Sequence, residues 1–325
     1  MKHINIITVD NNSGLSKDAA IVASVLRNAG FRVTVYPVGK PTLGHKLQRL
    51  GTCLHRAASY ACTARPPYAI NLFIENIIPS WFSYARINCL IPNQEWFREE
   101  SRPYLTEIDY ILCKTKFAQD IFEKLGCITE FISFTSTDRF QENHAKNYDA
   151  FFHMASSLQK GSNTLIDIWQ RHPEWPCLTI KQTRKGIVQV AAPNIEYITN
   201  YLDDEALGQY QNYYGIHLCP SEAEGFGHNI GEAMSCQAVA LTTNAPPMNE
   251  LIAPNRGILA DYGKTKVQRL GINYYVDPQD LEQKVNQVLG MAYAEKKQLG
   301  ENARDWYQQN DQFFRRRLVE VIRDI

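Results

Sequence analysis

The chain has 325 residues, of which 44% are hydrophobic, and this length accommodates two domains of ordinary size. Its 34 basic residues balance 34 acidic ones, so the formal net charge is zero and nothing favours nucleic acid as a partner. No apolar run approaches the length that spans a bilayer, and the first residues lack the order of regions in a signal peptide. The eight cysteines are scattered without a Cys-x-x-Cys pair, which favours a reduced, cytoplasmic protein without structural zinc.

Short apolar runs alternate with amphipathic segments along the chain. Strands are predicted in the first half at 3–9, 31–36, 69–74, 87–91, 110–113 and 128–132. In the second half they are predicted at 151–154, 178–181, 196–198, 215–219 and 238–242. Helical patterns lie between them, for example at 17–29 and 117–125. This alternation indicates an α/β protein with parallel sheets, right-handed crossovers and helices on both faces.

The alternation occurs twice, which predicts two Rossmann-like domains whose parallel sheets face a cleft. Ligands of such sheets gather at the carboxyl ends of the strands. We place the boundary in the polar stretch 141–148 (QENHAKNY). The predicted domains are therefore 1–145 and 146–310, followed by a last helix at 311–325.

A basic segment precedes the third predicted strand. Between Ala19 and Asn71 the chain has seven Lys or Arg residues and no acid, and within it apolar residues recur at helical spacing over 43–61. Such a helix is suited to bind an anionic membrane surface peripherally, which for a cytoplasmic protein is the inner face of the membrane. It is equally suited to bind an anionic acceptor. A surface helix with a solvated basic face is the alternative.

The most informative segment is 220–234, PSEAEGFGHNIGEAM. Its two carboxylates, Glu224 and Glu232, have seven residues between them, and a Gly-Phe-Gly bend follows the first. The segment comes after a predicted buried strand and leads into a helix, whose N-terminal N–H groups suit a phosphate. Carboxylates accept hydrogen bonds from hydroxyl donors such as those of sugars. The combination predicts a nucleotide-sugar site.

Each part of this segment also has a structural interpretation. Asn229 and Glu232 have the spacing of a capping box, in which Glu232 would satisfy the helix terminus. Glu222 and Glu224 would then be two solvated loop acids, and Gly225 and Gly227 simple turn formers.

Residues 220–252 (PSEAEGFGHNIGEAMSCQAVALTTNAPPMNELI) resemble the signature of the retaining family-4 glycosyltransferases of GT-B fold. Those proteins carry P-S-x-x-E-G-F-G, then E-A-M, then a strand ending in a loop with Pro and Glu. The resemblance implies that Glu224 holds hydroxyls of the transferred sugar, Glu232 holds the ribose, and the last helix packs back on the first domain. His228 is a further candidate for the sugar pocket, and the predicted catalytic residues are Glu224, Lys160 and His228. The donor-binding candidates are Gly225, Phe226, Gly227, Asn229, Ile230, Glu232, Ser156 and Ser157.

Lys160, followed by Gly161, occupies the place where this family has a Lys-Gly pair after the first strand of the second domain. By resemblance Lys160 contacts the donor diphosphate, and departure of that group requires a nearby cation or oriented N–H groups. The family's Arg a few residues earlier is absent. Candidate substitutes are Lys181, Arg184 and Lys185.

Polar residues in the predicted first domain are candidates for the acceptor side. Ser13 and Gly14 stand where relatives carry a glycine-rich turn, although a plain strand–helix turn is the alternative. Glu75 follows one predicted strand, and Asn93 and Glu95 follow the next. The His that many relatives have in this domain is missing, and ordinary polar loops are the alternative for these residues as well.

The sequence thus predicts a retaining glycosyltransferase that moves a sugar from a nucleotide sugar, of UDP or GDP type, to an acceptor hydroxyl of a glycan, a lipid-linked molecule or another compound. No Asp-x-Asp pair and no metal-ligand cluster occur, so no metal and no further cofactor are expected. A GT-B sugar-nucleotide epimerase or phosphorylase, or a non-catalytic GT-B sugar-binding subunit, are the alternatives.

Overall fold

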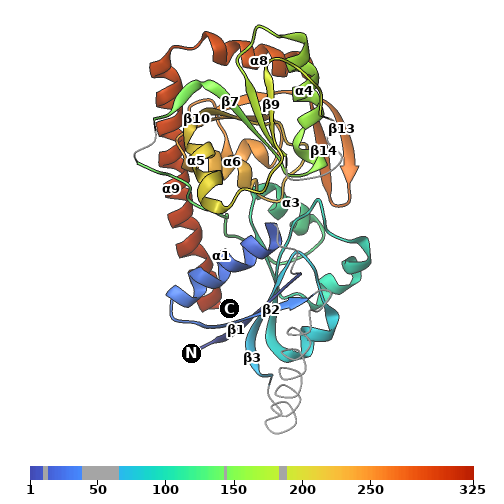
Figure 1. Cartoon of the computed structure of the whole chain (residues 1–325). Coiled ribbons are helices and arrows are strands. Elements are labelled where there is room, and N and C mark those ends of the chain that lie inside the picture. Colours follow the sequence, from blue (N-terminus) through green and yellow to red (C-terminus); the bar gives the residue numbers. More distant parts are fainter. Residues whose placement is uncertain (10–13, 39–65, 143–144, 183–188) are drawn as a thin grey trace. The chain divides into compact units, whose positions relative to one another are not determined.

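The structure is a computed structural model that describes residues 1–9, 14–38, 66–142, 145–182 and 189–325. The chain forms two compact units (Figure 1): unit 1 comprises 1–133 and 313–325, and unit 2 comprises 134–312. The basic segment 43–61, Ser13, Arg184 and Lys185 lie outside the described residues. Among the helices that are described, none is both long and apolar enough to cross a membrane.

Unit 1 contains a six-stranded parallel sheet with the strand order β2-β1-β3-β4-β5-β6 in its described part. Its strands are β1 (His3–Val9), β2 (Arg32–Val38), β3 (Tyr68–Ile74), β4 (Ala85–Ile91), β5 (Tyr110–Cys113) and β6 (Thr129–Phe131). The central strands are apolar along most of their length, as expected for a sheet covered on both faces. From β1 the chain adds β2 on one side and then β3 to β6 on the other, so the strand order reverses between β1 and β3.

The helical segments of unit 1 are α1 (Gly14–Asn28), η1 (Pro79–Tyr84), η2 (Glu99–Glu107) and α3 (Lys116–Lys124). Helix α1 buries Leu15, Val22 and Leu26, which recur at helical spacing along one face. A buried ion pair of 2.6 Å joins Lys114, just after β5, to Asp18 of α1. These contacts fix the start of α1 at the carboxyl edge of the sheet.

Unit 2 contains a second six-stranded parallel sheet, with the strand order β12-β11-β10-β7-β8-β9. Its strands are β7 (Asn147–Ala155), β8 (Leu178–Gln182), β9 (Ile195–Ile198), β10 (Tyr214–Cys219), β11 (Val239–Thr243) and β12 (Ile258–Ala260). A separate antiparallel hairpin consists of β13 (Tyr262–Gln268) and β14 (Gly271–Val276). In this sheet the direction of travel reverses between β7 and β10.

Helices cover both faces of the second sheet. They are η3 (Leu158–Lys160), α4 (Ser162–Arg171), α5 (Asp204–Tyr213), α6 (His228–Ser235), α7 (Met248–Leu251), α8 (Pro278–Gly290) and α9 (Tyr293–Asp324). Figure 1 shows α4 and α8 together on one face and α5 and α6 on the other. The core on the α4/α8 face joins Phe151, Trp169, Ile216 and Val285.

The predicted α/β architecture with two parallel sheets is confirmed, and each predicted strand has a counterpart within a few residues of its expected bounds. The sequence analysis did not predict β12, β13 or β14. It also began the last helix at 311, whereas α9 begins at Tyr293. The reason is that few side chains of 293–310 are buried apolar ones, Ala303 and Tyr307 among them, so no apolar stripe marks the helix.

The two units divide between Ser133 and Phe134, earlier in the chain than the predicted boundary at 145/146. The segment after Ser133 packs within unit 2: the ring of Phe134 lies 5.7 Å from that of Phe226, and the Arg139 N–H donates to Ser235 Oγ at 3.0 Å. At the other end, residues 313–325 of α9 belong to unit 1, where Arg317 pairs with Glu130 at 2.5 Å.

Candidate functional site

Two loops of unit 2 meet at the point where the strand order reverses. One follows β7 and carries Lys160; the other follows β10 and carries Glu224. Their side chains form an ion pair and are 12% and 10% exposed. Ligands of doubly wound sheets bind outside the carboxyl ends of the strands at such a switch point. Lys160 and Glu224, two of the three predicted catalytic residues, therefore lie together at the expected edge, and Glu224 is not a solvated loop acid.

Gly161 allows the two loops to approach each other. Its backbone is left-handed, with φ of 67°, and a Cβ atom there would lie 2.3 Å from the carbonyl oxygen of Pro220. The Glu222 N–H also donates to the Gln159 carbonyl at 2.8 Å. A residue with a side chain at position 161 would force the loops apart, which explains on steric grounds why a glycine follows Lys160.

A buried histidine lies beneath these loops. His153 of β7 has its Nδ1 2.8 Å from the Leu218 carbonyl and its Nε2 2.7 Å from Ser162 Oγ. Burial lowers the pKa of His153 to about 4, with a smaller contribution from the charge of Lys160. The neutral ring donates from Nδ1 to the carbonyl and accepts from the serine hydroxyl at Nε2. His153 thus joins β7 to β10 and to the first residue of α4.

Helix α6 begins directly after the Gly-Phe-Gly bend. Gly227 precedes it with φ of 113°, a conformation that L side chains rarely adopt. Asn229 donates weakly toward the Met154 carbonyl and Ser156 Oγ, at 3.4 and 3.5 Å, so the start of α6 lies next to the end of β7. Because the first N–H groups of a helix lack intrahelical partners, this end of α6 suits an anion.

The remaining residues of the motif divide between core and site. The side chains of Ile230, which is fully buried, and Phe226, which is 5% exposed, pack inside unit 2. Gly225 is buried, whereas His228 and Ser157 are half-buried. The ring of His228 lies 6.1 Å from that of Phe226.

Glu232 is buried inside unit 2, where it is 2% exposed. Its Oε2 accepts a hydrogen bond of 2.9 Å from Nε2 of Gln211 on α5. The capping-box interpretation is wrong, because α6 begins at His228 after the N-cap Gly227, and Asn229 is therefore not the N-cap. Gln211 was not predicted as a site residue, since a lone glutamine in a helix carries no sequence signal.

Lys181, a predicted substitute for the family's missing arginine, is engaged by backbone carbonyls. It is buried, and its Nζ donates to the carbonyls of Ile198 and Asn200 at 3.4 and 2.6 Å. Its ammonium therefore hydrogen-bonds the backbone carbonyls at the end of β9. The other two candidate substitutes lie outside the described residues.

The predicted acceptor-side residues lie in unit 1, and two of them meet there. Glu75, after β3, has a left-handed backbone with φ of 63°, and its Oε2 accepts from Asn93 Nδ2 at 2.7 Å. Glu95 is buried, 4% exposed, in the same turn as Asn93. Gly14 begins α1 and is exposed. Glu75 and Asn93 thus form a polar pair at the carboxyl ends of adjacent strands, and a strained backbone such as that of Glu75 is often found at functional sites.

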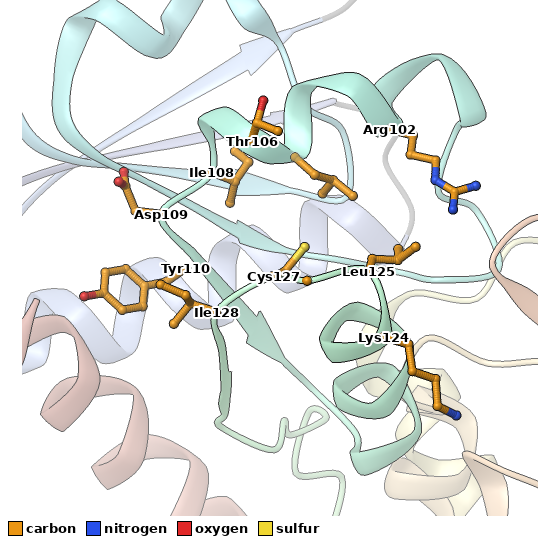
Figure 2. A pocket seen from close by; sticks show the side chains of 11 residues that line it. Arg102, Thr106, Ile108, Asp109, Tyr110, Lys124, Leu125, Cys127 and Ile128 are labelled. Atoms are coloured by element: carbon orange, nitrogen blue, oxygen red, sulfur yellow. The ribbon is translucent and has the colours of Figure 1, made fainter.

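A cavity of about 670 Å³ opens elsewhere in unit 1. Figure 2 shows side chains from η2, from the end of α3 and from the residues before β5 and β6 around it, including Arg102, Lys124 and Cys127. These segments lie at the amino ends of β5 and β6, whereas Glu75 and Asn93 lie at carboxyl ends. In the described parts of both units, no group of three or more His, Cys, Asp or Glu side chains is arranged to hold a metal ion.

Solved structures of known proteins have the same fold over the whole chain. Sucrose-phosphate synthase from Thermosynechococcus elongatus matches with a TM-score of 0.72 at 13% identity, covering 100% of this chain and 99% of that one. A glycosyltransferase from Rickettsia africae matches with a TM-score of 0.73 at 15% identity, covering 99% and 98%. Anabaena HepE in complex with UDP-glucose matches with a TM-score of 0.71 at 14% identity, covering 100% of both chains.

These matches define the class of the molecule: it has the GT-B fold of glycosyltransferases. Residues 190–306, all within unit 2, match the model of the family "Glycosyl transferases group 1". A sequence comparison with curated proteins found no significant match. The resemblance of 220–252 to glycosyltransferases of GT-B fold is therefore confirmed by the family match and by the fold.

Proposed function

We propose that the protein is a retaining, metal-independent glycosyltransferase that moves a sugar from a nucleotide sugar to an acceptor hydroxyl. The observation that carries this proposal is the ion pair of Lys160 and Glu224 at the switch point of unit 2, beside the start of α6. It places a cation, a carboxylate and helix N–H groups at one edge of a sheet. Of the two predicted donor types, UDP and GDP, the complex of HepE with UDP-glucose supports the UDP type.

The roles of the side chains follow from their chemistry. The Lys160 ammonium and the first N–H groups of α6 stabilise the negative charge on the departing diphosphate. Glu224 accepts hydrogen bonds from hydroxyls of the transferred sugar, and Glu232, oriented by Gln211, accepts from the ribose. Because Lys160 already holds a carboxylate partner, the donor diphosphate competes with Glu224 for the same ammonium.

The reaction requires no nucleophile from the protein. The bond between the anomeric carbon and the diphosphate oxygen breaks, and the acceptor oxygen bonds to that carbon on the same face. The acceptor proton passes to the departing phosphate oxygen. Glu75 and Asn93 of unit 1 are the proposed acceptor contacts, since a carboxylate and an amide together accept from and donate to hydroxyls.

A panel of UDP-, GDP- and ADP-sugars tests the proposal on the purified protein. One donor should raise the melting temperature, because a ligand at a hundred times its Kd stabilises by roughly 2.7 kcal/mol. The same donor should release nucleoside diphosphate, faster when a suitable acceptor is present. Release of free nucleotide that no acceptor accelerates would favour an epimerase, and binding without turnover would favour a sugar-binding subunit. No stabilisation by any of these sugars would contradict the proposal.

A further inference from the structure

The β13–β14 hairpin (Figure 1) forms a separate two-stranded sheet in unit 2, and β14 lies next to β11 of the main sheet. Strand β13 is exposed along almost its whole length, whereas Asn273 and Tyr274 of β14 are only 6% and 7% exposed. The hairpin therefore turns β14 inward and leaves β13 on the outside. The contacts of β14 therefore show whether the hairpin supports the candidate site.

Strand β14 contacts both loops of the candidate site. The Tyr274 N–H donates to the Glu222 carbonyl at 2.7 Å, and Asn273 Nδ2 donates to Glu222 Oε2 at 3.3 Å. Asn273 Oδ1 in turn accepts from Gln159 Nε2 at 3.2 Å. The Glu222 N–H closes the set by donating to the Gln159 carbonyl. One asparagine side chain thus bridges the two loops.

The bridged residues are close in sequence to the proposed catalytic pair. Gln159 directly precedes Lys160, and Glu222 is two residues before Glu224. We propose that Asn273 is a positioning residue that holds the Lys160 and Glu224 loops in register for sugar transfer. This inference rests on the proposed function and adds to it a residue that neither loop contains.

An amide at position 273 suits the chemistry of the bridge. The Asn273 side chain donates through Nδ2 to a carboxylate and accepts through Oδ1 from an amide, so its two amide atoms serve the two loops separately. Glu222 is half-buried, and burial raises its pKa, while the hydrogen bond from Asn273 opposes that rise. Replacing the Nδ2 donor by an oxygen would place two carboxylates against each other in this half-buried position.

A charge swap between positions 222 and 273 tests the proposal in the whole chain. Asn273→Asp alone sets a second carboxylate against Glu222. In the double variant Glu222→Gln with Asn273→Asp, the introduced carboxylate accepts from Gln159 and from the introduced glutamine, so each hydrogen bond has a donor and an acceptor again. Thr265→Asp is the matched control, because it adds the same charge to the exposed strand β13 of the hairpin.

We expect Asn273→Asp to lower kcat by about tenfold or more near pH 7.5, measured with the donor that the wild type turns over. A tenfold loss corresponds to about 1.4 kcal/mol of coupling. The loss should shrink on acidification, as the two carboxylates come to share a proton. The double variant should recover kcat to within about threefold, with the wild-type pH profile, and Thr265→Asp should leave kcat unchanged.

Several results would overturn the proposal. They are a normal kcat in Asn273→Asp, a double variant as slow as the single one, or an equal loss in the control. If Asn273→Asp does not fold, the double variant still decides: a folded double variant with wild-type kcat supports the bridge, and a folded but slow one overturns it. A wild type that turns over no nucleotide sugar would instead remove the proposed function, and the role of Asn273 with it.

Discussion

Single residues of unit 2 determine how closely its two site loops approach. Gly161 has both a left-handed backbone and no room for a Cβ atom, and the buried ring of His153 links β7, β10 and α4. Gln211 orients Glu232 from a neighbouring helix. None of these three residues lies within the segment 220–234, yet Gly161 is packed against its Pro220 and Gln211 contacts its Glu232.

Gly161→Ala should lower stability and donor affinity more than a Gly→Ala substitution at another left-handed glycine. Gly126 is the matched control, because its φ is 81° and a Cβ atom there would meet nothing within 4 Å. Gly126→Ala should cost about 1 kcal/mol of stability through its backbone alone. Gly161→Ala should cost more and also weaken nucleotide-sugar binding, which calorimetric titration of both variants measures. Equal stability and equal donor affinity in the two variants would show that the contact with Pro220 is not limiting.

Stability should fall on acidification because buried neutral histidines must be protonated in the unfolded chain. The pKa of His153 is lowered to about 4 by burial, from an unfolded value near 6.5. The unfolded state therefore binds more protons between these values, and stability is lost as pH falls from about 6.5 to about 4, by on the order of 3 kcal/mol for this residue. His153→Gln should flatten the dependence of urea unfolding on pH. An unchanged slope would contradict the assignment of a neutral ring.

At the scale of elements, the central strands of unit 1 are joined by a row of buried asparagines. Asn5 of β1, Asn71 of β3 and Asn88 of β4 are register neighbours, and Asn71 accepts from Asn5 at 3.0 Å and donates to Asn88 at 2.9 Å. Such a row is favourable only while each member keeps its partner. It fixes the register of the strands whose carboxyl ends carry Glu75 and Asn93.

Asn71→Leu should therefore destabilise the chain by on the order of 3 kcal/mol, since it leaves polar groups of Asn5 and Asn88 buried without this partner. The triple variant with Leu at positions 5, 71 and 88 should lose less, because no side-chain polar group of the row then remains. Urea unfolding of both variants compares them. A triple variant less stable than the single one would show that the row stabilises the sheet by more than the hydrogen bonds among its own side chains.

The sequence predicted the longer buried strands of the two main sheets and missed the short strand β12 and the β13–β14 hairpin. Strands β1 and β5 were predicted to the residue, because buried parallel strands are continuous apolar runs. Strand β12 has only three residues, and β13 is exposed with a polar alternation, so neither produces such a run. Because the hairpin was missed, Asn273 could not be placed near Lys160. The prediction that Lys160 and Glu224 serve one donor site came from resemblance and not from spacing, since they are 64 positions apart, and their ion pair was not predicted.

At the scale of the whole molecule, the account predicts catalysis without a divalent metal. Lys160 and the start of α6 supply the positive charge that a metal supplies elsewhere. Turnover of the donor should persist in excess EDTA at close to its rate without chelator, as measured by nucleoside diphosphate release. A strict requirement for magnesium or manganese would contradict the proposed mechanism while leaving donor binding intact.

The most direct test of the central claim is the turnover number of Lys160→Ala with the preferred nucleotide sugar. Lys297→Ala is the control, because Lys297 is 55% exposed on α9 and pairs only loosely with Glu301, at 3.7 Å. Loss of one oriented stabilising group costs about 10²–10³ in kcat. We predict a loss of this size in Lys160→Ala, mainly in kcat, with Lys297→Ala at the wild-type rate. Near-normal turnover in Lys160→Ala would contradict the claim that this lysine stabilises the leaving diphosphate.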